Sequence, residues 1–221
     1  MRKFIKGKSL SFDFNKFRSK LKTYLIAGLV IAISVAGLYI YLNHANKSGY
    51  EKYAQAQNLY LQALQEENEK KIENLEKAAQ LFKELDAQTF WFGSREEVLF
   101  YLADCLYRLN RLEESAYKLK EFKEKHPESY FSPWANLKLA LIYEKIGSHE
   151  EAMDIYEVIK EKYALTPVAP EAFLGLARCK ELIGEEEEAI EIYQNLISRY
   201  PLSRQAEIAE VKLQYLGQKK G

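Results

Sequence analysis

Residues 173–201 read FLGLARCKELIGEEEEAIEIYQNLISRYP and contain two short helical patterns, one on each side of Gly184. Apolar residues recur at three- and four-residue intervals in both halves, as they do on one face of a helix. Glycine tolerates the left-handed backbone that ends many helices, so Gly184 marks the break. Residues 185–188 are all glutamates, which favour the positive end of a helix dipole. The stretch therefore predicts two helices joined by a tight turn.

The same pattern recurs along the body of the chain with a period of 37 residues. The break falls at Asn110, Gly147 and Gly184, and a small residue follows at Ser115, Ala152 and Ala189. The units end on similar tripeptides: Lys125-His126-Pro127, Lys162-Tyr163-Ala164 and Arg199-Tyr200-Pro201. One helix pair cannot bury its apolar face alone, so this repetition predicts pairs that stack around a continuous core.

These residues resemble the tetratricopeptide repeat, whose signature is W-x2-L-G-x2-Y, then A-x3-F, then P. One copy carries Phe173, Leu176, Ala177, Gly184, Ala189, Tyr193 and Pro201. Three residues depart from the signature. Asn136 and Ala164, in the preceding copy, replace the large aromatic residue and the proline, and Lys180, in this copy, replaces the tyrosine. The resemblance covers roughly residues 50–216. It implies an all-α fold, a right-handed α-solenoid of about four helix pairs with a C-terminal capping helix.

The two ends of the array are expected to differ from its middle. A looser first copy is expected before residue 90, with an expanded, charged joint near residues 66–71. Its matching residues are Tyr53, Ala56, Tyr60, Ala78 and Phe82. Segment 203–216 is predicted to be the capping helix, with Ser203 as its N-cap. Its outward-facing residues are expected to be polar: Glu207, Glu210 and Lys212.

An uncharged stretch of 19 residues, YLIAGLVIAISVAGLYIYL, occupies positions 24–42. A helix of this length spans roughly 28 Å, close to the hydrocarbon thickness of a bilayer. A buried soluble helix is the first alternative, but such helices are seldom apolar on every face. A cleavable signal peptide is the second, but its apolar region is shorter and is followed by a small-x-small site. We therefore predict an uncleaved transmembrane helix.

The formal net charge of the chain is zero, but the charge is divided unevenly. Residues 1–23 hold eight basic side chains and one acidic one, a net charge of +7, so residues 24–221 carry −7. Lysine and arginine close to a span stay on the cytoplasmic side. We therefore expect a cytoplasmic tail (1–23), a single-pass span of the inner membrane (24–42) and a periplasmic or extracytoplasmic repeat domain (43–221).

Gly28, Ala32 and Ala36 recur every four residues and form a small-residue face on the predicted span. Such faces let two helices approach closely in a membrane. A homo-oligomer formed through this face is one hypothesis, and an ordinary span without a partner helix is the other.

The residue types needed for catalysis are scattered along the repeat. His44, His126 and His149 are far apart in the sequence, and no glycine-rich phosphate loop is present. Cys105 and Cys179 are 74 residues apart, which places them at the same position of two repeats that are not neighbours. Stacking of the repeats should hold them too far apart for a disulfide, so we predict that both are small apolar core residues. We therefore predict a non-enzymatic protein without a metal, a cofactor or a nucleic-acid partner.

The first helix of each repeat is expected to line a concave groove. The repeat spacing brings these groove candidates together: Phe100, Asp104, Tyr107, Trp134, Leu137, Leu141, Leu174 and Arg178. Apolar residues among acidic ones suit an apolar or basic peptide segment. The alternative is that helix packing or the capping helix covers them.

Aromatic residues also cluster at two junctions between repeats, at residues 90–92 (Phe-Trp-Phe) and at Tyr130-Phe131. Such residues either fill the seam between repeats or form a second docking patch. Both hypotheses stay open at the sequence level.

A finer resemblance comes from the Pro-x-Ser junctions at residues 127–129 and 201–203. Together with the basic tail and single span, they resemble the ancillary subunit of the Sec translocon and related bacterial envelope tetratricopeptide proteins. That resemblance implies partners among translocon subunits, periplasmic chaperones or envelope assembly factors. An envelope-biogenesis or cell-division scaffold, a regulatory subunit of a membrane enzyme, and an oligomerisation module are the alternatives.

Overall fold

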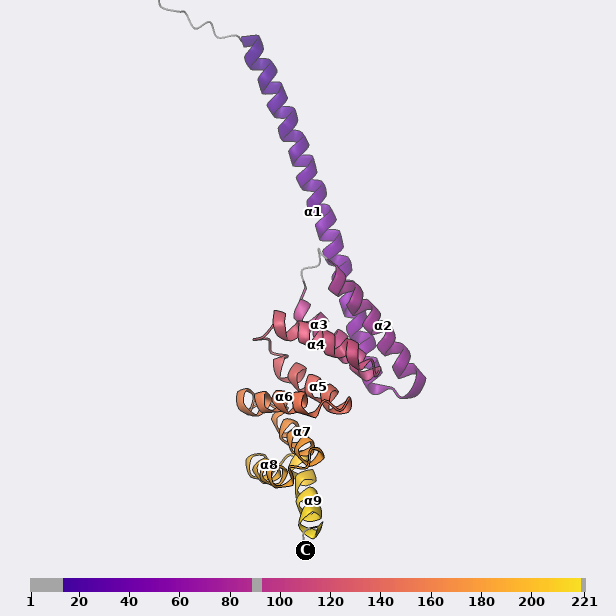
Figure 1. The fold of residues 1–221 in the computed structure, drawn as a ribbon. Coiled ribbons are helices and arrows are strands. Elements are labelled where there is room, and N and C mark those ends of the chain that lie inside the picture. The colour runs from indigo at the N-terminus through magenta and orange to yellow at the C-terminus, as the bar shows by residue number, and fades with distance from the viewer. Residues whose placement is uncertain (1–13, 89–92, 220–221) are drawn as a thin grey trace, which may run out of the picture. The chain divides into compact units, whose positions relative to one another are not determined.

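The computed structural model describes residues 14–88 and 93–219, and this part of the chain contains nine helices and no strand (Figure 1). The helices are α1 (Phe14–Gln65), α2 (Asn68–Ala87), α3 (Arg95–Arg108), α4 (Leu112–Lys125), α5 (Ser132–Lys145), α6 (His149–Lys162), α7 (Ala169–Leu182), α8 (Glu186–Arg199) and α9 (Arg204–Lys219). The all-α fold predicted from the sequence is confirmed.

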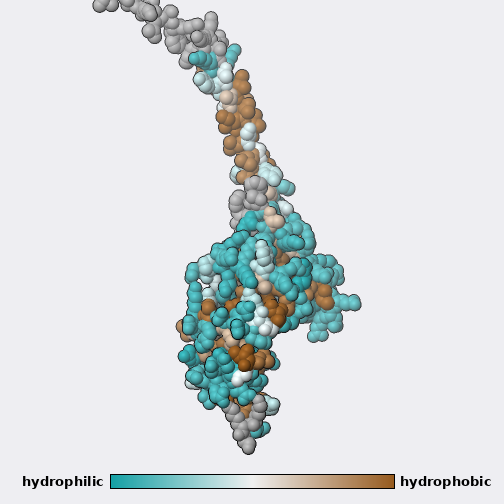
Figure 2. Space-filling model, in the orientation of Figure 1, coloured by the Kyte–Doolittle hydropathy of each residue, from teal (hydrophilic) through white to brown (hydrophobic). Residues whose placement is uncertain are grey.

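The chain divides into two compact units, residues 1–48 and residues 49–221. In the first unit, the described side chains from position 20 to position 40 are all exposed. Figure 2 shows a band of hydrophobic surface along this helix. A core helix would bury part of that surface, whereas a membrane span exposes it to lipid on all sides. One helix of the described chain is long and apolar enough to cross a membrane, and a signal sequence meets the same criterion.

The second unit is an array of helix pairs. The pairs α3–α4, α5–α6 and α7–α8 pack internally, and α4 packs on α5, α6 on α7 and α8 on α9. Each consecutive contact buries one face of a helix, so the core continues from pair to pair. The stacked array expected from the 37-residue period is confirmed.

The backbone at each break explains why the pairs turn where they do. Asn110, Gly147 and Gly184 have φ values of 60°, 85° and 88°, in the left-handed region that ends a helix. The small residues that follow these breaks, Ser115, Ala152 and Ala189, have no exposed surface. They let the second helix of each pair approach the first closely, as the pattern predicted.

The first pair is made by the last part of α1 and by α2. Ala56, Ala78 and Phe82 are completely buried in one cluster, which confirms the looser first copy. The break between the helices is confined to residues 66 and 67. Helix α2 has 20 residues, whereas α4, α6 and α8 have 14. Most of the expected charged joint is therefore helical and lengthens this hairpin.

Helix α9 closes the array. Its first turn is capped by Ser203, whose Oγ accepts a hydrogen bond from the amide N of Ala206 at 3.1 Å, as predicted. Glu207 and Glu210 are exposed, but the Nζ of Lys212 lies 3.0 Å from Glu181 instead of pointing outward. The outer face instead exposes Ile208, Val211 and Tyr215, which the sequence pattern did not predict.

Candidate functional site

The first helices of the pairs, α3, α5 and α7, carry the side chains expected to line the groove. The structure buries Phe100, Asp104 and Leu174, and leaves Tyr107, Trp134, Leu137, Leu141 and Arg178 half-buried. Three of the half-buried residues are apolar and belong to α5. We call Trp134, Leu137 and Leu141 the α5 patch.

The buried aromatic and aliphatic candidates pack inside the array. The ring of Phe100 stacks on Phe131, with centroids 4.8 Å apart, and lies 6.1 Å from the ring of Phe122. Leu174 belongs to the buried cluster that includes Tyr193 and Ala209. These residues join successive pairs, which is the packing alternative that the sequence left open.

Asp104 is the centre of a buried polar cluster that links three first helices. It accepts hydrogen bonds from the hydroxyl of Tyr60 at 2.6 Å and from Nε of Arg108 at 2.5 Å, and it pairs with Lys138. Burial alone raises the pKa of Asp104, but Lys138, Tyr60 and Arg108 outweigh it and hold the pKa below its ordinary value. The Lys138 ammonium lies 4.6 Å from the centre of the Tyr107 ring. The negative charge of the Asp104 carboxylate is therefore stabilised by neighbouring side chains of the same array.

Two similar clusters follow along the array. Glu144 accepts hydrogen bonds from the hydroxyl of Tyr156 at 2.7 Å and from Arg178 at 2.7 and 3.0 Å. Glu181 accepts one from the hydroxyl of Tyr193 and pairs with Lys212 at 3.0 Å. We call the three pairs Asp104–Lys138, Glu144–Arg178 and Glu181–Lys212 the acid–base ladder.

The acid–base ladder changes the chemistry expected of the groove. In each pair, an acid on one first helix meets a base on the next first helix along the chain. These three carboxylates are thus neutralised within the array and are not free to attract a basic peptide. Two of the pairs are 34 residues apart, a spacing through which the sequence could have revealed them. Of the predicted groove residues, those of the α5 patch are apolar and remain partly exposed.

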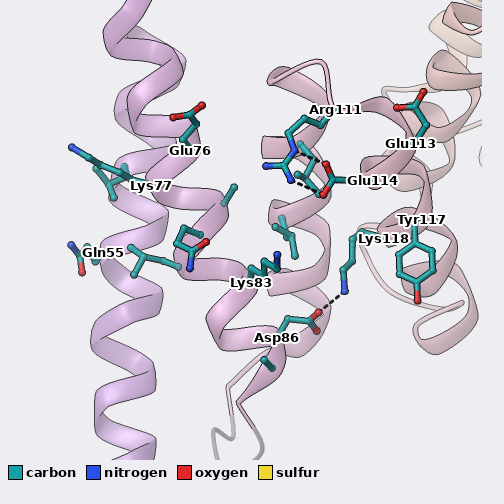
Figure 3. A pocket seen from close by; sticks show the side chains of 17 residues that line it. Gln55, Glu76, Lys77, Lys83, Asp86, Arg111, Glu113, Glu114, Tyr117 and Lys118 are labelled. Carbon is teal, nitrogen blue, oxygen red and sulfur yellow. Dashed lines mark hydrogen bonds and ion pairs between the residues drawn. The ribbon is translucent and has the colours of Figure 1, made fainter.

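A hollow of about 1050 Å³ lies among α1, α2, α3 and α4, away from the predicted groove residues (Figure 3). Its floor is apolar and includes Leu102 and Leu106. Charged residues surround it, and several pair with one another: Arg111 binds Glu114 at 2.5 and 2.6 Å, and Lys118 binds Asp86 at 2.6 Å. Four bases and four acids line this hollow, so it offers no net charge to a ligand.

The described residues contain no group of three histidine, cysteine or carboxylate side chains that could hold a metal ion. Both cysteines are free and buried, as the sequence predicted. Burial raises the pKa of Cys105 to about 12 and that of Cys179 to about 11, so both thiols are protonated at neutral pH. A protonated, buried thiol is a poor nucleophile.

The small-residue face of the predicted span lies in the first unit. Gly28, Ala32 and Ala36 are exposed, and a Cβ added to Gly28 would meet no atom within 4 Å. The face is open within the described chain, and its role in oligomerisation stays a prediction.

Of the two junctions with aromatic residues, the structure describes the one at Tyr130 and Phe131. The other junction, residues 90–92, lies outside the described residues. Phe131 fills the seam against Phe100, whereas Tyr130 is 77% exposed and lies 5.1 Å from the Trp134 ring. One aromatic residue of this junction thus packs in the array and the other borders the α5 patch.

The tetratricopeptide-repeat family profile matches residues 97–129, 134–166 and 171–203. Each match begins in a first helix and includes the second helix of the same pair. The chain therefore contains tetratricopeptide repeats, as the resemblance implied. No curated protein matches the sequence.

Three solved structures are similar to this chain in fold. MamA is 21% identical, with a TM-score of 0.51 over 66% of this chain and 80% of its own. The tetratricopeptide-like repeats of a Podosopora anserina kinesin light chain are 17% identical, with a TM-score of 0.58 over 80% and 90%. YrrB, described as having an unusual peptide-binding site, is 16% identical, with a TM-score of 0.54 over 81% and 87%. At these identities the likeness shows the fold alone.

Proposed function

We propose that this tetratricopeptide-repeat chain is a membrane-anchored, non-enzymatic scaffold that holds protein partners on the extracytoplasmic side of the membrane. Tetratricopeptide arrays are typical of protein-interaction scaffolds, and three such repeats are present. The exposed apolar helix in residues 24–42 supports the anchor, and the basic tail before it supports the orientation.

The observation that carries the binding role is the α5 patch beside the acid–base ladder. Trp134, Leu137 and Leu141 keep part of their surface exposed, while the neighbouring Asp104 and Glu144 are already paired. Apolar burial is worth about 25 cal/mol per Å². A partner at this site therefore gains affinity chiefly by covering Trp134 and the two leucines.

The pathway follows from the resemblance to the ancillary Sec translocon subunit. Export or envelope assembly near the translocon is our first proposal, with translocon subunits and periplasmic chaperones as partners. An envelope-biogenesis or cell-division scaffold and a regulatory subunit of a membrane enzyme complex are alternatives, since both would use the same anchored array.

The pathway is tested by photo-crosslinking from the groove in native membranes. A photoreactive amino acid replaces Leu137 in the full chain, and crosslinked proteins are identified by mass spectrometry. Translocon subunits or chaperones are the expected products. Recovery of self-dimers alone would contradict the export proposal.

The groove is tested by Trp134→Ala combined with Leu141→Ala, with Leu165→Ala as the matched control. Leu165 is a fully exposed leucine outside the groove set. The double variant is expected to reduce crosslinking at least tenfold while circular dichroism stays unchanged, and the control is expected to have no effect. Equal crosslinking by the wild type, the double variant and the control would exclude the α5 patch as the binding site.

A further inference from the structure

The hollow among α1, α2, α3 and α4 lies between two successive second helices of the array, α2 and α4. Its floor includes Leu102 and Leu106 of α3. Figure 3 shows Lys83 on the wall formed by α2, and Tyr117 and Lys118 on the wall formed by α4. Its volume of about 1050 Å³ is large enough to hold a ligand. We call the space between two successive second helices a second-helix seam.

The repeat register explains why this second-helix seam is open. The next one lies between α4 and α6, 37 residues further along the chain. There, Tyr143 of α5 occupies the position of Leu106, and Ile155 of α6 occupies the position of Lys118. Ile155 belongs to the buried core cluster, and Tyr143 packs against that cluster. The first seam therefore lacks an aromatic ring and a branched apolar side chain that fill the next one.

A lysine accompanies the aromatic ring in the filled seam, and the open seam has its counterpart. The ammonium of Lys120 lies 5.3 Å from the centre of the Tyr143 ring. Lys83 precedes Lys120 by 37 residues, lines the hollow and is exposed. Lys118 on the opposite wall is engaged by Asp86 at 2.6 Å, whereas Lys83 forms no ion pair within the described residues. The open seam thus keeps the cation but lacks the ring.

The chemistry of the hollow favours an aromatic ligand over a charged or an aliphatic one. Its walls carry equal numbers of acids and bases, so a charged group gains no net attraction there. An aliphatic chain would cover Leu102 and Leu106 but would give Lys83 no partner. An aromatic ring does both, because its edge and body are apolar and its face attracts an ammonium group.

We propose that this hollow receives an aromatic side chain, together with a neighbouring aliphatic one, from a segment of a protein partner. The ring covers Leu102 and Leu106 and meets the ammonium of Lys83, as the Tyr143 ring meets Lys120. The aliphatic side chain takes the place that Ile155 has in the next seam. This inference rests on the proposed scaffold function and adds a second docking site, formed chiefly by second helices.

The test uses the full chain in lipid nanodiscs and a fluorescent nine-residue peptide with one tyrosine between two isoleucines. Its twin has alanine in place of the tyrosine. Fluorescence anisotropy is expected to show at least tenfold weaker binding of the alanine twin, because alanine leaves most of the apolar floor uncovered.

Two variants of the hollow locate the binding site. Leu106→Tyr introduces the residue that fills the next seam, and is expected to weaken binding of the tyrosine peptide at least tenfold. Lys83→Gln removes the ammonium from an exposed position, where the fold does not depend on it, and is expected to weaken binding about two- to fivefold. The matched controls Leu165→Tyr and Lys162→Gln lie outside the hollow and are expected to have no effect. Circular dichroism checks the fold of each variant.

Several outcomes would overturn the inference. Equal binding of the two peptides, or no binding at millimolar concentration, would show that the hollow receives no ring. Unchanged binding by a folded Leu106→Tyr or by Lys83→Gln would place the ring elsewhere. Binding that appears only after the aromatic residues 90–92 are changed to serine would make the chain its own occupant. A dimer that Leu106→Tyr dissociates would identify a second copy as the occupant.

The variant Trp134→Ala with Leu141→Ala separates this inference from the proposed function, and it is expected to leave peptide binding unchanged. If only that variant abolishes binding, the ring enters the groove, so the inference fails and the groove proposal stands. If the peptide binds the hollow as expected but photo-crosslinking from Leu137 yields self-dimers alone, the inference stands and the export proposal fails.

Discussion

Gly175 lies against the ring of Tyr156, and its lack of a side chain makes that contact possible. A Cβ at this position would lie 2.3 Å from Cζ of Tyr156, whose ring is completely buried. Because the hydroxyl is also bonded to Glu144, the ring has little freedom to move away. We expect Gly175→Ala to lower the free energy of unfolding by about 1–3 kcal/mol, through overpacking.

Gly217→Ala is the matched control for that prediction. Gly217 is also helical, but a Cβ there would meet nothing within 4 Å. Alanine favours a helix by up to about 1 kcal/mol over glycine, so this variant is expected to be neutral or slightly stabilising. Urea unfolding followed by circular dichroism measures both. Equal destabilisation by the two variants would contradict the packing explanation.

Glu144 makes the stability of the array depend on pH. Burial alone raises its pKa, but the hydrogen bonds from Arg178 and Tyr156 outweigh it and lower the pKa. A lowered pKa stabilises the folded state above the ordinary value of 4.5, and this contribution is lost as the pH falls through the folded pKa. We expect the thermal midpoint of the wild type to fall more between pH 7 and pH 4 than that of Glu144→Gln. The same fall in both proteins would exclude a role for this carboxylate.

At the scale of the helix, the two serines that precede α9 and α6 differ in what they do. Ser203 accepts a hydrogen bond from the amide of Ala206 at 3.1 Å, whereas Ser148 makes no side-chain cap bond. We expect Ser203→Ala to cost about 1 kcal/mol. Ser148→Ala is expected to cost less than about 0.5 kcal/mol. Chemical unfolding of the two variants provides the comparison, and a reversed order would show that α9 does not depend on its cap.

The helices themselves could be predicted because their boundaries depend on local chemistry. Asn110, Gly147 and Gly184 take the left-handed conformation that few other residues adopt, so the breaks were visible in the sequence. The acid–base ladder was not predicted, although two of its pairs share a spacing of 34 residues, because its partners lie on different helices and meet only after the pairs have stacked. The same reason explains Phe100 and Leu174, whose burial depends on the following pair.

The ends of the array were the least predictable part. Lys212 was expected to face outward, since a capping helix usually has a polar outer side. It pairs instead with Glu181 on α7, while Ile208, Val211 and Tyr215 are exposed. A lone terminal helix has two open sides, and the sequence does not specify which one remains apolar.

At the scale of the whole molecule, the division of charge predicts how the chain is oriented. The net charge of zero combines +7 in residues 1–23 with −7 in the rest of the chain, separated by the uncharged stretch 24–42. Tails rich in lysine and arginine beside a membrane span stay on the cytoplasmic side. We therefore predict that the repeat array lies on the opposite side, where only extracytoplasmic partners would reach it.

Cysteine labelling of the full chain in bacterial cells tests that claim most directly. Leu202 is fully exposed, so Leu202→Cys provides an accessible thiol. The native thiols Cys105 and Cys179 are buried, and wild type serves as the unlabelled control. We predict that a membrane-impermeant maleimide labels Leu202→Cys when only the outer membrane has been opened. Labelling that requires the inner membrane to be permeabilised would place the array in the cytoplasm and contradict the proposed anchored scaffold.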